Sequence, residues 1–182
     1  MAKPKSTAQP PVPIAIGASA PDFKLPDRRG RVHRLKDYRG RFIVLYFYPE
    51  DDTPLCTTQA CQFRDSHSDF EKLNAVVLGI SPDDAASHDA FTAKFNLPFT
   101  LLADVKDDSR NPPVSTLYGA WGEKNMYGNF IRGMLRTTYL IDPAGVVVKR
   151  WDRVKTPRHG ETVLAAVREL ATGGQPKPRK KN

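Results

Sequence analysis

The sequence of 182 residues contains only two cysteines and four histidines, and it has no long apolar run. Two cysteines are too few for a disulfide-dense secreted scaffold or a four-cysteine zinc site. The four histidines show no metal-ligand spacing, and no segment supplies the roughly 20 apolar residues of a membrane-spanning helix. These scarcities leave a globular protein whose length suits one domain.

Acidic residues are missing from both ends of the chain, which has a net charge of +8. Residues 1–13 and 172–182 contain six Lys or Arg and no acid, so the segment between them carries only +2. Because both ends are also rich in proline, we predict disordered tails that flank a single domain at 14–171. The nearly neutral domain disfavours a nucleic-acid-binding module, so we expect no specific nucleic-acid partner.

The first residues also lack the apolar core of a secretory signal. We therefore expect a cytoplasmic location and no membrane partner.

Apolar runs alternate with helical patterns along this domain. Buried strands are predicted at 41–48, 75–81 and 99–103, and strand hairpins at 23–35 and 139–148. Helices are predicted at 55–73, 83–95 and 160–170. Together these elements predict an α/β fold with a central mixed β-sheet, helices on both faces and an N-terminal β-hairpin.

The stretch 105–132 shows the least regular pattern of the domain. It contains Pro112, Pro113 and several glycines. We therefore expect loops here, with a short helix around 114–118.

Cys56 lies where the first central strand gives way to a helix. The strand ends at Pro49, and Thr53 is placed to cap the helix. A thiol at this point meets unpaired backbone N–H groups and the positive end of the helix dipole, and both favour the nucleophilic thiolate. Cys56 is therefore a candidate nucleophile, and the alternative is a buried, inert cysteine.

Cys61 follows Cys56 by five residues. In a regular helix this spacing separates the Cα atoms by about 8–9 Å, whereas a disulfide needs roughly 4.4–6.8 Å. The two thiols can join only if the first helical turns unwind. The spacing also differs from the C-x-x-C motif, which disfavours a thiol–disulfide oxidoreductase, the other enzyme class considered.

The segment PEDDTPLCTTQACQFRD, residues 49–65, resembles the active-site segment of the peroxiredoxins. The subgroup it resembles most closely is that of the bacterioferritin comigratory protein, or peroxiredoxin Q. Further similar stretches are APDFKL, LGIS, FTLLAD and RTTYLID, so the resemblance spans about 17–171. It implies a thioredoxin-like fold and places a Pro-x-x-x-Thr-x-x-Cys motif on Pro49, Thr53 and Cys56.

The resemblance implies a thiol-dependent peroxidase that reduces hydrogen peroxide and organic hydroperoxides in antioxidant defence, without metal, haem or flavin. It assigns peroxide attack to Cys56, resolution through an intramolecular disulfide to Cys61, and charge stabilisation to Arg136. Thr53 would orient the peroxide and Pro49 would shield the sulfur from water. Thioredoxin or a similar dithiol is the implied reductant, and we expect a monomer, with a dimer as the alternative. A one-cysteine peroxidase that does not require Cys61 stays open.

Overall fold

The computed structural model describes residues 11–173 of the chain. The predicted tails, 1–13 and 172–182, lie mostly outside this range. Of their described residues, Pro11 and Val12 lie against Gly122 and Gly119, where an added Cβ would come within 2.5 Å of them. Side chains at these two glycine positions would therefore displace the segment.

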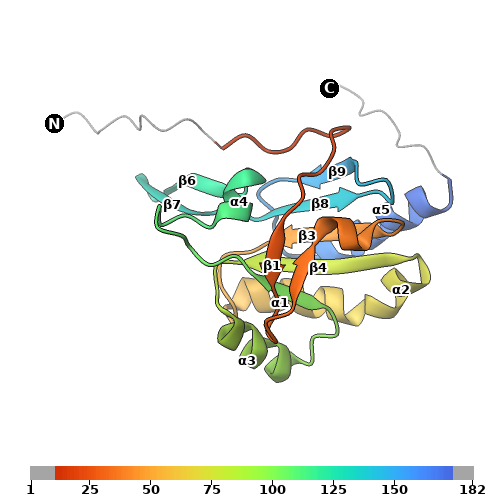
Figure 1. Ribbon diagram of the computed structural model, residues 1–182, viewed down its shortest axis with the longest axis horizontal. Helices are drawn as coiled ribbons and strands as arrows, with labels where there is room; N and C mark the ends of the chain where they lie inside the picture. Colours follow the sequence, from red (N-terminus) through yellow and green to blue (C-terminus); the bar gives the residue numbers. More distant parts are fainter. Residues whose placement is uncertain (1–10, 174–182) are drawn as a thin grey trace.

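A five-stranded mixed sheet forms the centre of the domain, in the order β5-β4-β3-β8-β9 (Figure 1). The strands are β1 (Lys24–Pro26), β2 (Val32–Arg34), β3 (Phe42–Phe47), β4 (Ala75–Ser81), β5 (Thr100–Ala103), β6 (Trp121–Met126), β7 (Asn129–Met134), β8 (Thr137–Ile141) and β9 (Val147–Trp151). The helices are the 3₁₀ helix η1 (Leu35–Tyr38), α1 (Pro54–Asp65), α2 (His67–Lys72), α3 (Ala85–Phe95), α4 (Pro113–Leu117) and α5 (His159–Ala171).

Strand β3 is buried on both faces, as its unbroken apolar sequence predicts. Its alternate residues enter two hydrophobic clusters, with Leu45 on one side and Tyr46 on the other. The helices α1, α2, α3 and α5 contribute to the Tyr46 side, while hairpin β1–β2, η1 and α4 contribute to the Leu45 side. Figure 1 shows the hairpin crossing the front of the sheet and α1 lying behind it. The predicted mixed sheet, helices on both faces and N-terminal hairpin are confirmed.

The single helix predicted at 55–73 is wrong in one respect, because the chain leaves the helical conformation at Ser66. Helix α1 ends at Asp65, and α2 begins at His67. Periodic apolar residues continue across the break, which is why the pattern did not reveal it.

The stretch 105–132, expected to form loops, instead contributes β6 and most of β7. Gly122 and Gly133 are cross-strand partners in this hairpin, and Tyr127 and Gly128 form its tip with φ of 53° and 87°. Two positive φ values are typical of the tight turns that join paired strands. The glycines thus serve a hairpin and not a loop. The short helix expected around 114–118 is confirmed as α4.

No helix among the described residues combines the length and the apolar character needed to cross a membrane.

His159 generates a prediction about the pH dependence of folding. Burial lowers the pKa of His159 from 6.5 to about 4, and Thr138 Oγ1 lies 2.9 Å from its Nε2. The resulting stabilisation is fully present above pH 6.5 and is lost as the pH falls toward 4, by about 3 kcal/mol in total. His159→Gln should therefore lose less unfolding free energy than the parent chain between pH 7 and pH 4 in urea titrations. A constant difference between the two chains would contradict this account.

Candidate active site

The loop that joins β3 to α1 carries the predicted motif. Asp52 adopts a left-handed conformation with φ of 56°, and Pro54 starts the helix. Thr53 occupies the N-cap position, but its hydroxyl donates to the Glu50 carbonyl oxygen at 3.1 Å and accepts no hydrogen bond from a helical N–H group. Its oxygen lone pairs therefore remain available as acceptors.

Cys56 lies in the first turn of α1 with only 1% of its surface exposed. The Nη2 group of Arg136 donates to Cys56 Sγ at 3.1 Å. Both residues were predicted site residues, and the structure brings them together. A guanidinium at this distance places a fixed positive charge and a hydrogen-bond donor beside the sulfur.

The pairing of β3 with β8 explains this contact between residues 80 positions apart. The two strands are antiparallel, with Phe47 opposite Thr137. The residue just before β8 therefore lies beside the loop that follows β3. The sheet places Arg136 next to the N-terminus of α1.

Gln59 is a neighbour of this pair that was not among the predicted site residues. Its side chain is 1% exposed, and its Oε1 accepts a hydrogen bond from Arg136 Nη1 at 3.2 Å. Gln59 follows Cys56 by three residues, so both lie on one face of the helix. This three-residue spacing is the sequence feature that could have indicated a place for Gln59 beside Cys56. One guanidinium thus contacts both side chains through separate nitrogens.

Tyr46 borders the same region from strand β3. Burial raises the pKa of Tyr46 well above its usual range, and the charge of Asp51 acts in the same direction. Neither the Tyr46 hydroxyl nor Gln59 Nε2 has a hydrogen-bond partner among the described residues. The charged neighbour of the sulfur is therefore the Arg136 guanidinium, beside these two neutral polar groups.

Cys61 is half-buried in the same helix, and both cysteines are free thiols. The helix continues through both positions without a break. The separation of about 8–9 Å expected for a regular helix therefore applies here. In this conformation the two thiols are too far apart to bond.

A cavity of about 470 Å³ opens beside this site. Pro49 and Arg136 line it, together with Phe130 and Met134 of β7 and Val154 after β9. The hairpin β6–β7, which the sequence analysis did not predict, thus forms one wall. The cavity offers an approach to the Arg136 guanidinium for a small molecule with an apolar part.

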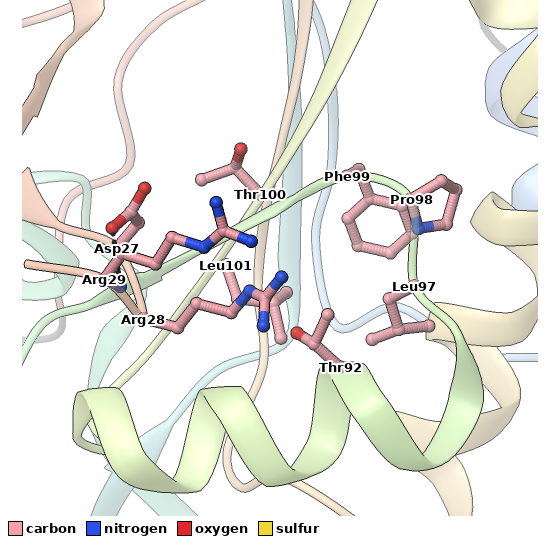
Figure 2. Close-up of a pocket in the computed structure, with 9 residues that line it drawn as sticks. All are labelled: Asp27, Arg28, Arg29, Thr92, Leu97, Pro98, Phe99, Thr100 and Leu101. Atoms are coloured by element: carbon pink, nitrogen blue, oxygen red, sulfur yellow. Dashed lines mark hydrogen bonds between the residues drawn. The ribbon is translucent and has the colours of Figure 1, made fainter. Parts of the chain in front are cut away.

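A second cavity, of about 250 Å³, lies between the β1–β2 turn, α3 and the start of β5 (Figure 2). Figure 2 shows Arg28 and Arg29 extending from the turn toward Thr92 and Thr100. Arg28 pairs with Asp89, which ties the hairpin to α3. None of the predicted site residues lines this cavity.

Within residues 11–173, no three His, Cys, Asp or Glu side chains are grouped so that they could hold a metal ion.

Comparisons with known proteins agree with the motif and the geometry. Residues 16–150 match the AhpC/TSA family. Peroxiredoxin Bcp of Bacillus subtilis is 42% identical over 158 residues, which cover 87% of this chain and 98% of that protein. The putative peroxiredoxin bcp of Coxiella burnetii is 47% identical over 151 residues, covering 83% and 97%.

Solved structures of similar proteins share the fold. Peroxiredoxin Q of Xanthomonas campestris superimposes with a TM-score of 0.75 at 37% identity, covering 82% of this chain and 91% of that one. A mutant PrxQ of Xylella fastidiosa gives a TM-score of 0.78 at 34% identity, covering 87% and 98%. A thiol beside an arginine on a thioredoxin-like fold, matched over nearly the whole domain, leads to one assignment: the chain belongs to the AhpC/TSA family, in its Bcp and peroxiredoxin Q group.

Proposed function

We propose that this chain is a thiol-dependent peroxidase in which Cys56 attacks hydroperoxides. The contact between Arg136 and Cys56 Sγ at 3.1 Å carries the proposal. It supplies both a stabilised thiolate and a fixed positive charge at the position where the peroxide bond would break. We place this activity in the domain predicted for residues 14–171.

In the first step, the Cys56 thiolate attacks the terminal oxygen of the peroxide. A bond forms between sulfur and oxygen, the O–O bond breaks, and the leaving oxygen takes a proton to become water or an alcohol. Cys56 is left as a sulfenic acid. Arg136 stabilises the negative charge that develops on the departing oxygen.

Thr53 and Pro49 shape the position of the peroxide. Because the Thr53 hydroxyl already donates to Glu50, its lone pairs accept the hydrogen bond of the peroxide O–H group. Pro49 lines the cavity beside Arg136 and offers no N–H group there. It therefore keeps water from the sulfur without competing for the peroxide.

In the second step, the Cys61 thiol attacks the sulfenic acid of Cys56. A disulfide forms between the two cysteines and water is released. Both cysteines then stay oxidised until a reductant restores their thiols. Because a regular helix holds the two Cα atoms about 8–9 Å apart, the first turns of α1 must open.

In the third step, an external dithiol reduces the disulfide and becomes oxidised itself. We propose thioredoxin or a similar dithiol protein for this role. The substrates are hydrogen peroxide and organic hydroperoxides. Work on the Xanthomonas campestris bacterioferritin comigratory protein describes an alkyl peroxide reduction activity, which supports the organic substrates.

The cellular setting follows from the chemistry. Two free thiols that must be reduced after each turnover suit a reducing compartment, so we propose that the chain acts in the cytoplasm as an antioxidant. All residues of the scheme come from one chain, which is consistent with a monomer.

Thiol counting tests the function directly. One equivalent of hydrogen peroxide should remove both thiols and create a peptide that links Cys56 to Cys61, because oxidation and resolution follow each other. Mass spectrometry of the alkylated, digested protein measures this. If the number of free thiols were the same before and after peroxide treatment, the proposed peroxidase function would be wrong.

The Cys61→Ser variant separates the two-cysteine scheme from the one-cysteine alternative. We expect thioredoxin-coupled turnover to stop while one round of oxidation at Cys56 persists, since only resolution needs Cys61. Peroxide consumption with thioredoxin, its reductase and NADPH gives the turnover. Persisting turnover would mean that the reductant resolves Cys56 directly. The Cys56→Ser variant serves as the control in which neither reaction occurs.

Arg136→Ala should slow the oxidation of Cys56 by about 100-fold, as the loss of one hydrogen-bond donor does at other oxyanion sites. The variant should also alkylate more slowly with iodoacetamide at pH 7, because the sulfur loses its charged hydrogen-bond donor. Arg153→Gln provides the matched control, since Arg153 lines the same cavity without a contact to the sulfur. Equal slowing in both variants would indicate a general loss of positive charge.

A further inference from the structure

A buried hydrogen-bond network ties the β3–α1 loop to helix α3, outside the residues used above. Its centre is Asp51, which is 8% exposed, and its partner on α3 is His88, which is fully buried. Asp51 Oδ2 lies 2.8 Å from His88 Nδ1 and accepts the Ser87 hydroxyl at 2.8 Å. Asp51 Oδ1 accepts the Tyr48 hydroxyl at 2.5 Å. One carboxylate thus collects three donors, one from Tyr48 directly after β3 and two from α3.

The protons in this network follow from its partners. Burial raises the pKa of Tyr48 well above its usual range, so the hydroxyl is the donor. His88 donates through Nδ1, because an ionised carboxylate only accepts. Its Nε2 has no partner among the described residues. The Asp51 carboxylate is therefore the group that fixes the orientation of the His88 ring.

Two further contacts hold the same loop. The backbone N–H of Asp51 donates to Asp83 Oδ2 at 2.9 Å, and Lys94 of α3 pairs with Asp52 at 2.6 Å. Asp52 is in the left-handed region, which is unfavourable for a residue with a side chain. Such a conformation persists only where neighbouring contacts maintain it. The loop shape therefore depends on α3.

The network lies directly before the helical turn that carries Cys56. It ends at Asp52, and the first helical hydrogen bond of α1, from Thr57 N–H to the Thr53 carbonyl, begins directly after it. The turn that holds Cys56 against Arg136 thus starts from an anchored loop. We call the contacts of Asp51 and Asp52 with Asp83 and α3 the anchor. Opening the first turn of α1 requires the loop to leave the conformation that the anchor maintains.

We propose that His88 and Asp51 are positioning residues that hold Cys56 in its oxidation-competent place and delay the opening of α1. The role rests on the proposed function, in which Cys61 must reach Cys56. A delay in opening α1 delays that step. His88 acts through Asp51 and touches neither sulfur nor peroxide.

The delay decides between two fates of oxidised Cys56. In one, Cys56–SOH and Cys61–SH form the disulfide and release water. In the other, a second hydroperoxide transfers an oxygen to the sulfenate, which gives Cys56 sulfinate and an alcohol or water. A firm anchor prolongs the helical state and favours the second fate at high peroxide. A loosened anchor favours the disulfide.

A pair of nearly isosteric substitutions tests the anchor. His88→Leu and His88→Asn both remove the imidazole ring, but Asn keeps an N–H donor at the position of Nδ1. In hydrogen-exchange measurements on the reduced protein, the amides of residues 57–61 should exchange at least fivefold faster in the Leu variant than in the Asn variant. Equal exchange in the two variants would overturn the proposal.

Kinetics supply the second measurement. Relative to His88→Asn, His88→Leu should react at least fivefold more slowly with hydrogen peroxide at Cys56 and form the disulfide at least threefold faster once oxidised. It should also yield less sulfinate at high peroxide. Rapid-quench mass spectrometry follows all three products. A decrease in both rates would contradict the anchor role.

Two controls separate the anchor from a general loss of stability. Leu97→Ala removes a buried side chain that follows α3 without touching Asp51, and it should leave the ratio of the two rates unchanged. If His88→Leu does not fold, Ser87→Ala removes another donor from the same carboxylate and should change exchange and rates in the same direction. If the parent chain does not react with peroxide, the peroxidase function fails, while the exchange comparison still decides the anchor.

Discussion

The antiparallel pairing of β8 with β3 is the constraint on which the site depends. Five residue pairs join the two strands, and the last of them sets Thr137 beside Phe47. A parallel β8 would start at the opposite edge of the sheet, about 14 Å away at 3.4 Å per residue. Arg136 would then lie far from Cys56. The direction of one strand therefore decides whether a charged donor meets the sulfur.

Helix α1 faces two demands that its geometry does not satisfy together. Its first turn holds Cys56 against Arg136, and the same regular turns keep Cys61 too far away to bond. In the proposed scheme, oxidation therefore requires a formed helix and resolution requires an opened one. The contacts around the β3–α1 loop set the balance between these states. Three of them come from α3, through Ser87, His88 and Lys94, and these residues make no hydrogen bond to the sulfur.

Much of this arrangement was predictable from the sequence, because its signals are local. The apolar run of β3 and the position of Cys56 between a strand and a helix each lie in one short segment, and the family resemblance then pointed to Arg136. The β6–β7 hairpin was not predicted, because glycine normally indicates a loop, whereas Gly122 and Gly133 face each other across two strands. The contact of Asp51 with His88 joins residues 37 positions apart, and the periodic pattern of apolar residues does not predict a contact of this kind.

The burial of Cys56 makes the identity of its neighbours decisive. A sulfur that is 1% exposed has lost almost all its contact with water, so a protein donor must replace that hydration when the sulfur carries charge. Charge interactions are also stronger in such a site than at the surface. Gln59 shares the Arg136 guanidinium as a neutral acceptor, whereas a carboxylate at this position would compete with the sulfur for the same positive charge. The amide thus orients Arg136 while leaving its charge directed at Cys56, and this is what a buried nucleophile requires.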